Sequence, residues 1–199
     1  MTFAEISTVL ACITFAISSI LYIRDTASAR ITPSIATFGV LSLVNFSQLI
    51  SLIEKEVWHV VPFTIVGFLQ AFIVFIIAIR GKRFYFGIFD MIALVGALAG
   101  YVFWILSQDA AYNIYIINIV TFITFMPLII KAFREPALET KLPWRTNLLA
   151  SFFLLLAITS TAPYVWIVPV RQFICSLLIN IGISLGKKPS IKKRSRRTA

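Results

Sequence analysis

The chain has 199 residues, of which 59% are hydrophobic and only 13% are charged, and its formal net charge is +10. A soluble domain is about half apolar and about a quarter charged. Here the apolar residues are collected into runs of about 20, the length of a helix that crosses a bilayer. The composition excludes an ordinary soluble domain and predicts an all-α integral membrane protein whose helices contact membrane lipid.

Seven membrane spans are expected. The first has no basic segment before it and no small-residue cleavage site, so we expect a retained helix rather than a signal peptide. Cys12 and Cys175 lie in apolar runs and are expected to be free, buried thiols. In chain order the spans are about Ile6–Ile23, Ser34–Ile53, Val60–Ile79, Phe84–Leu106, Ala111–Ile130, Asn147–Thr161 (which can start at Trp144) and Tyr164–Leu185.

The basic residues predict the orientation of these spans. If the spans alternate in direction, sixteen of the eighteen lysines and arginines fall on one side of the membrane, and only Lys55 and Arg171 do not. Because Lys and Arg concentrate in cytoplasmic loops, we expect the N-terminus outside and the C-terminus in the cytoplasm. The protein is therefore predicted to be a multi-pass protein of the cell inner membrane. Its basic tail, residues 187–199, is expected to hold to anionic lipid rather than nucleic acid.

An internal repeat organises the chain. Residues 13–33 match residues 123–143 at seven positions without a gap, against about two expected by chance. The offset of 110 maps the first three spans onto the last three and leaves the fourth unpaired. This predicts a 3+1+3 parallel repeat: triple-helix bundles at 1–83 and 110–186, a linker helix at 84–109, and the tail at 187–199. An offset of 107 also matches Val61-Pro62 with Val168-Pro169.

The second copy of the repeat has a proline in an apolar run, a short basic turn and a further proline: Pro127, then Lys131 and Arg134, then Pro143. This pattern resembles the PQ-loop motif of the SWEET/PQ-loop (MtN3/saliva-like) membrane transporter superfamily. The chain looks like a bacterial seven-helix relative of that superfamily. Two departures are that Leu128 stands where the namesake glutamine would be and Ile17 where a fourth proline would be.

The resemblance implies hinges near a cytoplasmic gate at Pro33, Pro127 and Pro143. The three prolines differ in position. Only Pro127 interrupts an apolar run, where it removes a helical hydrogen bond. Such a break in lipid must face neighbouring helices or a cavity. Pro33 and Pro143 are expected to open helices, where a missing N–H costs little; both a helix-start role and a hinge role remain open for them.

Polar side chains within the spans are the candidate solute-binding groups. The offset of 110 pairs Gln70 on the third span with Asn180 on the seventh. This resembles SWEET proteins, in which an amide from the third helix of each repeat contacts the sugar. SWEET proteins also place a tryptophan on the sixth helix, whereas Trp144 and Trp166 here bracket the expected sixth span. The remaining candidate amides are Asn45, Gln48, Asn118 and Gln172.

Amides donate and accept hydrogen bonds, which suits a neutral hydroxylated or zwitterionic solute. The alternative is that they only tie helices together, at about 0.6 kcal/mol each. Arg171 lies about eight residues into the seventh span. It is expected either to snorkel outward or pair with Glu5 or Asp109, or to attract an anionic or carboxylate-bearing solute.

The sequence has no paired carboxylates at membrane depth, no Gly-rich phosphate loop and no Ser/His/Asp set, and His59 stands alone. We therefore expect no enzyme, no cofactor and no metal site. The predicted function is a transporter or permease for a small polar solute by alternating access. The alternative is a non-transporting membrane receptor or scaffold with the same fold. The solute, ion coupling and homo-oligomer formation are left open.

Overall fold

The computed structural model describes residues 1–31, 33–81, 88–136 and 139–186. The predicted basic tail at 187–199 and the predicted start of the linker at residue 84 lie outside these ranges. Within them the chain forms α1 (Phe3–Ala27), α2 (Ile35–Glu54), α3 (Val61–Arg80), α4 (Ile88–Ser107), α5 (Ala110–Arg134), α6 (Lys141–Leu156) and α7 (Pro163–Leu185), and no strand. Five of these helices, α1, α2, α3, α5 and α7, are long and apolar enough to cross a membrane. The prediction of an all-α membrane protein is confirmed at this level.

Polar caps define where several helices begin. Thr2 and Glu5 form a capping box on α1, in which the Thr2 amide donates to Glu5 Oε2 at 2.9 Å. Ser34 Oγ accepts from the Thr37 amide at the start of α2, and Asp109 Oδ1 accepts from the Ala111 amide at 2.9 Å at the start of α5. These side chains satisfy N–H groups that have no partner within the first turn.

The sixth helix differs from its prediction. α6 covers Lys141–Leu156, about six residues earlier than the expected span, because Pro143 fits the first turn without losing a helical hydrogen bond. It ends before a non-helical segment at 157–162, in which the Ser160 carbonyl accepts from Trp166 Nε1 at 2.7 Å. Trp144, which was expected to bracket this helix or to begin it, therefore lies within it.

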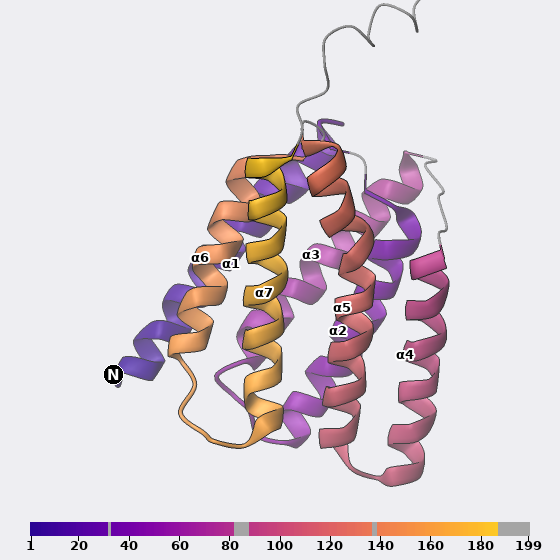
Figure 1. Cartoon of the computed structure of the whole chain (residues 1–199). Coiled ribbons are helices and arrows are strands. Elements are labelled where there is room, and N and C mark those ends of the chain that lie inside the picture. The colour runs from indigo at the N-terminus through magenta and orange to yellow at the C-terminus, as the bar shows by residue number, and fades with distance from the viewer. Residues whose placement is uncertain (32, 82–87, 137–138, 187–199) are drawn as a thin grey trace, which may run out of the picture.

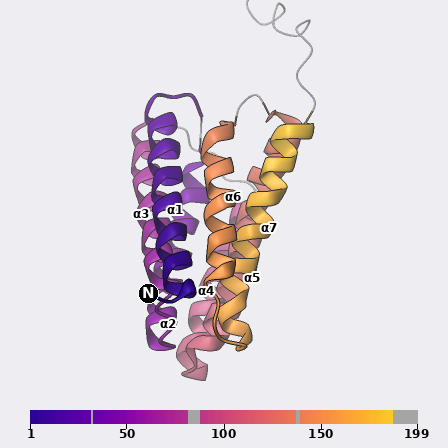
Figure 2. The ribbon, with the colours of Figure 1, turned by 90° about the vertical axis from the view of Figure 1, so that its left-hand side faces the viewer.

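The helices pack as two sets of three with a matching order. α3 packs against both α1 and α2, and α7 packs against both α5 and α6. The two sets meet along two seams, where α1 packs against α6 and α2 packs against α5 (Figures 1 and 2). Below, the first set denotes α1–α3 and the second set denotes α5–α7.

Each seam carries buried hydrogen bonds. On the α1–α6 seam, Ser18 Oγ donates to the Pro143 carbonyl at 2.6 Å. On the α2–α5 seam, Asn113 Nδ2 donates to Ser47 Oγ at 3.0 Å and to Ser51 Oγ at 2.6 Å. Because these groups have no water to bond in a membrane interior, their pairing stabilises contact between the sets.

α4 packs mainly against α5 through two glycines one turn apart. A Cβ at Gly96 would lie 2.9 Å from Val120 Cγ2, and one at Gly100 would lie 2.8 Å from Ile116 Cγ2. This Gly-xxx-Gly spacing lets two membrane helices approach closely. The outer face of α4 exposes large apolar side chains such as Leu98, as a lipid-facing helix does.

Charged residues are distributed unequally between the two ends of the bundle. The basic end is the one at which α1, α3, α5 and α7 finish. The last turns of α1, α3 and α5 there carry Arg24, Arg80, Lys131 and Arg134. The opposite end holds the short connections at 55–60, 108–109 and 157–162. Exposed Trp58 and Trp166 lie at this opposite end, as aromatic residues do at a membrane surface.

Candidate functional site

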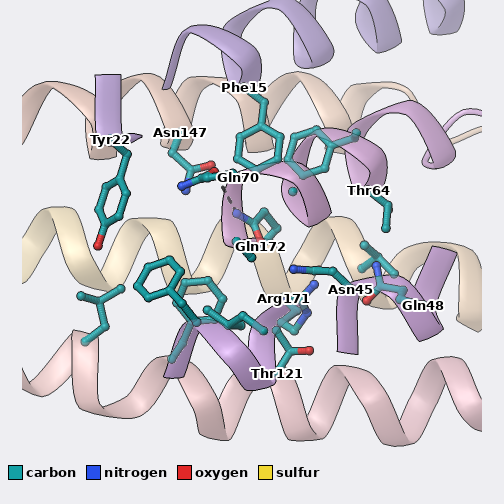
Figure 3. Close-up of a pocket in the computed structure, with 18 of the residues that line it drawn as sticks. Phe15, Tyr22, Asn45, Gln48, Thr64, Gln70, Thr121, Asn147, Arg171 and Gln172 are labelled. Atoms are coloured by element: carbon teal, nitrogen blue, oxygen red, sulfur yellow. Dashed lines mark hydrogen bonds between the residues drawn. The ribbon is translucent and has the colours of Figure 1, made fainter. Parts of the chain in front are cut away.

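A cavity lies at the centre of the bundle, between the first and second sets. Its lining comes from α1, α2, α3, α5, α6 and α7, so every helix of both sets contributes (Figure 3). Its empty volume, including the part open to solvent, is about 650 Å³. Small-molecule sites commonly combine apolar walls with a few convergent polar groups, as this lining does.

Five of the predicted site residues line this cavity. They come from α2, α3 and α7 and include the one cation predicted at membrane depth. These residues are Asn45, Gln48, Gln70, Arg171 and Gln172.

Asn118 and Asn180, the other two predicted residues, do not line the cavity. Asn118 lies behind it, where its Oδ1 accepts from Arg171 Nε at 2.6 Å. Asn180 donates from Nδ2 to the carbonyls of Trp144 and Ser176, both at 2.8 Å. Its amide therefore ties α7 to α6. The expected matched pair of Gln70 and Asn180 does not meet in one site.

The bounds of the helices explain this failure. α1 starts at residue 3 and α5 at residue 110, an offset of 107, whereas the starts of α3 at 61 and α7 at 163 differ by 102. Both offsets are smaller than the offset of 110 that the sequence repeat gives. Gln70 and Asn180 consequently sit at different heights along their helices, and only Gln70 reaches the cavity.

Arg171 does not snorkel outward, and it forms no ion pair with an acid among the described residues. Its residue is 8% exposed, and it points into the cavity beside Asn45 and Thr121 (Figure 3). Both predicted partners are engaged elsewhere, because Glu5 caps α1 and Asp109 pairs with Lys55 at 2.6 Å. Within the described ranges, the recorded polar partner of the guanidinium is Asn118 Oδ1.

Two other amides on the lining are held by hydrogen bonds. Gln70 Oε1 accepts from Ser19 Oγ at 2.8 Å, which links α3 to α1. Gln172 Nε2 donates to Asn147 Oδ1 at 3.2 Å, which links α7 to α6. These contacts fix the positions of both side chains on the cavity wall.

Asn147 and Thr64 line the cavity but were not among the predicted site residues. Asn147 begins the predicted sixth span, which can also start at Trp144, and its amide was not among the predicted site residues. The observed start of α6 at Lys141 places Asn147 inside the helix. Thr64 gave no signal, because its hydroxyl donates to the Val60 carbonyl at 3.1 Å, as threonines commonly do within helices.

Aromatic side chains line the part of the cavity nearest the basic end. The ring of Tyr22 lies 5.8 Å from that of Phe38 and meets the ring of Trp144 edge-on at 5.9 Å. All three line the cavity and are nearly buried. Because Tyr22 and Phe38 belong to the first set and Trp144 to the second, this aromatic cluster joins the two sets.

An ion pair lies directly behind the aromatic cluster. Lys131 Nζ donates to Glu139 Oε1 at 2.7 Å, and Trp144 Nε1 donates to Glu139 Oε2 at 3.4 Å. The Glu139 side chain is only 1% exposed. The carboxylate thus connects the end of α5 to the start of α6 and orients the Trp144 ring.

The three predicted hinge prolines occupy different positions. Pro127 lies inside α5, next to the cavity-lining Leu128, so its ring nitrogen cannot donate to the Ile123 carbonyl. Pro143 is in the first turn of α6. Pro33 precedes the Ser34 cap and lies outside α2. A further proline, Pro169, lies inside α7 beside Val168, which also lines the cavity.

A buried apolar cluster lies between the sets toward the opposite end of the bundle. Leu52, Val60, Ile114, Val165 and Val168 form one buried cluster between the sets. Outside this cluster, the hydrogen bond between Lys55 and Asp109 holds the pKa of Asp109 below its usual value and raises the pKa of Lys55. His59 lies in the same region, and burial lowers its pKa.

The remaining chemistry in the described part of the chain is sparse. No group of three or more His, Cys, Asp or Glu side chains there is arranged to hold a metal ion. Cys12 and Cys175 are free thiols, and Cys175 is buried. Comparison with protein-family models, curated proteins and solved structures gave no match for this chain. A functional assignment therefore depends on the geometry of the cavity itself.

Proposed function

We propose that the protein is a membrane transporter or permease that moves a small polar solute by alternating access. The observation that carries this proposal is the central cavity, which has polar side chains on an apolar lining and is walled by both sets of helices. A solute held between two packed bodies can be released to either side when the bodies rock about it.

The packing order of the helices supports a 3+1+3 architecture. In each set the third helix packs between the other two, and α4 lies outside both sets, mainly against α5. Under this proposal all seven helices cross the membrane, and α4 gives the two sets the same orientation. The basic end would face the cytoplasm by the positive-inside rule, with the N-terminus outside the inner membrane. The basic tail would hold to anionic lipid there.

Membership of the SWEET/PQ-loop superfamily is part of this proposal. It is supported by the proline and basic-turn pattern together with the packing order of the two sets. Trp144, on the sixth helix and on the cavity wall, adds a feature that the resemblance implied and the sequence reading had missed.

The inner gate of this transporter would be the aromatic cluster of Tyr22, Phe38 and Trp144. Opening toward the basic end requires Trp144 to move away from Tyr22, which would separate α6 from α1. Pro127 weakens α5 beside this cluster, because the helix lacks one hydrogen bond there. The second set can therefore bend where the gate must part.

Accessibility of a cysteine on the cavity wall tests alternating access without knowledge of the solute. In a chain with Cys12 and Cys175 replaced by Ala, Thr121→Cys would be treated with a membrane-impermeant thiol reagent in right-side-out and inside-out vesicles. We expect labelling from both sides, because the cavity opens alternately to each. Labelling from one side only, or from neither, would contradict the transporter proposal and favour a receptor or scaffold.

A matched control uses exposed residues at the two ends of the bundle. Glu135→Cys at the basic end and Glu56→Cys at the opposite end should each be labelled from one side only. The cytoplasmic assignment of the basic end predicts labelling of Glu135→Cys in inside-out vesicles. The reverse result would overturn the orientation while leaving the cavity result intact.

A further inference from the structure

Arg171 is a buried cation without a counterion in the described part of the chain. Its Nε donates to Asn118 Oδ1, and Asn118 Nδ2 in turn donates to the Ile114 carbonyl at 2.7 Å. The second bond fixes the Asn118 amide with its oxygen toward Arg171. An unpaired charge at membrane depth is strongly unfavourable, so such residues commonly mark the path of a solute or ion.

The hydrogen bond to Asn118 leaves the terminal nitrogens of Arg171 without a recorded protein partner among the described residues. Arg171 lines the cavity, and Figure 3 shows its guanidinium among the cavity side chains. A planar guanidinium matches the two oxygens of a carboxylate and forms paired, charge-assisted hydrogen bonds with it. The cavity therefore contains a guanidinium group, held in place by Asn118, that can pair with the carboxylate of a solute.

Gln48 supplies a second and independent requirement. It is 1% exposed and lines the cavity, yet its Oε1 has no hydrogen-bond partner among the described residues. Buried polar atoms are nearly always paired in native structures. The Oε1 atom is shielded by its neighbours, so the side chain must turn toward the cavity to accept a hydrogen bond from an occupant, for example from a hydroxyl group.

The lining also argues against other solute classes. None of its residues is acidic, so an ammonium group placed beside Arg171 would meet a like charge without an opposing one. This disfavours amino acids. A neutral polyol would leave Arg171 unneutralised. The remaining class bears one negative charge and a hydroxyl.

We propose that this cavity binds a small hydroxylated monocarboxylate, whose carboxylate pairs with Arg171 and whose hydroxyl donates to Gln48 Oε1. The proposal rests on the proposed function for its route of transport, but the binding site can be tested separately. Four three-carbon probes differ by one group each: lactate, propionate without the hydroxyl, 1,2-propanediol without the carboxylate, and alanine with an ammonium in place of the hydroxyl.

Binding of these probes to the purified full chain in detergent is the first measurement, by calorimetry. Lactate should bind best, with 1,2-propanediol and alanine weaker by about tenfold or more, since each loses or opposes a charge-assisted contact. Propionate should be intermediate. Equal binding of lactate and 1,2-propanediol, or tighter binding of alanine, would overturn the proposal. Chloride that competes as well as propionate would also overturn it, because the site would then recognise charge alone.

Variants assign the two contacts. Arg171→Gln should weaken lactate binding by about tenfold to a hundredfold, and Arg171→Lys should retain part of it because a point charge lacks the fork. The exposed Arg145→Gln is the matched control and should bind as the parent does. Gln48→Leu should make lactate and propionate equivalent. Unchanged lactate binding in folded Arg171→Gln would overturn the assignment; if that variant does not fold, Arg171→Lys and the probe series decide it.

Uptake of labelled lactate into proteoliposomes separates this inference from the transporter proposal. Binding that depends on Arg171 without uptake would support the site and contradict transport. Uptake of 1,2-propanediol or glucose that is unaffected by Arg171→Gln would support transport and overturn the carboxylate assignment. Lactate uptake lost in Arg171→Gln and kept in Arg145→Gln would support both.

Discussion

The first and second sets share a packing order but differ in how their helices can bend. In the first set the helices are uninterrupted, because Pro62 lies in the first turn of α3 and Pro33 lies before α2. In the second set, Pro127 and Pro169 lie inside α5 and α7 beside cavity-lining residues. The second set also carries Arg171. One packing scheme therefore supports a stiffer half and a half that can bend and holds the charge.

The two sets differ most in the turns at the basic end, where each has a buried acid with a different kind of basic partner. Asp25 is buried, and its carboxylate meets Arg24 at 3.3 Å and Arg30 at 3.5 Å, both of which are more than half exposed. At the offset of 110, Asp25 aligns with Glu135. Glu135 is exposed, however, and the buried acid of the second turn is Glu139. Glu139 depends on the partly buried Lys131.

Removing Lys131 is accordingly expected to have the largest effect on stability. Lys131→Met leaves the Glu139 carboxylate buried without its partner and should lower the free energy of unfolding by about 2–3 kcal/mol. Arg30→Gln, at the exposed partner of Asp25, should cost less than about 1 kcal/mol. Chemical unfolding in mixed micelles measures both. Equal losses of unfolding free energy in the two variants would show that the two turns depend equally on their ion pairs.

A pair of glycines gives the next largest difference between the sets. A Cβ at Gly182 on α7 would lie 2.9 Å from the Phe133 ring and 3.0 Å from the backbone of Ala132 on α5. A Cβ at Gly67 on α3 would lie 3.4 Å from Phe15 on α1, an ordinary contact. Gly182→Ala should destabilise by about 1–2 kcal/mol through overpacking.

Gly67→Ala is the matched substitution in the first set. It should be neutral or stabilising by up to about 1 kcal/mol, because alanine is the better helix former. The same unfolding measurement applies. A larger loss for Gly67→Ala than for Gly182→Ala would reverse the assignment of the tighter interface to the second set.

Replacing Pro127 tests whether the second set needs its break. Pro127→Ala supplies an N–H for the Ile123 carbonyl and should stabilise the protein by up to about 1 kcal/mol. It should also reduce labelling of Thr121→Cys from the basic end, since a continuous α5 resists bending. Pro62→Ala is the control and should change neither quantity, because a first-turn N–H has no helical acceptor. Unchanged labelling in Pro127→Ala would contradict the proposed role of Pro127 in opening the gate.

His59 gives the smallest expected effect, and it is confined to the first set. Its pKa lies below the ordinary value of about 6.5 because burial disfavours the charged ring. As the pH falls below 6.5 the unfolded chain takes up this proton first, so stability is full above that value and is lost down to the folded-state pKa.

The change should stay below about 1 kcal/mol for a half-buried ring, and His59→Gln should flatten it. Thermal unfolding followed by tryptophan fluorescence across pH 5–8 measures it. The corresponding connection of the second set, residues 157–162, contains no titratable side chain. Persistence of the same pH slope in His59→Gln would assign it to another group.

The helical type of the protein could be predicted from the sequence, because long apolar runs in a membrane protein form helices. The predicted spans lie close to α1, α2, α3, α5 and α7. The sixth span was misplaced. Its helix begins before the apolar run and includes the charged residues Lys141 and Arg145, so hydropathy alone does not give its start. The Gly96 and Gly100 contact that holds α4 was also readable as a motif, yet hydropathy gives no weight to small residues.

The cavity could be predicted less completely. Asn45, Gln48, Gln70, Arg171 and Gln172 were readable because polar groups in apolar runs are rare and costly. Whether an amide faces a cavity or a neighbouring helix depends on helix rotation and height, which differ by whole turns between the sets. Asn180 illustrates this, since its amide bonds backbone carbonyls on α6 and α7.

Because α4 packs mainly against α5 and less against α2, we expect it to move together with the second set. Its outer face includes the exposed Leu98, and no residue of α4 is on the cavity lining. A fluorescent probe at Leu98 and a second one on the exposed face of α3, at Leu69, would therefore act as a molecular ruler. The distance between them would report whether the proposed rocking of one set against the other takes place, and neither probe would lie on the cavity lining.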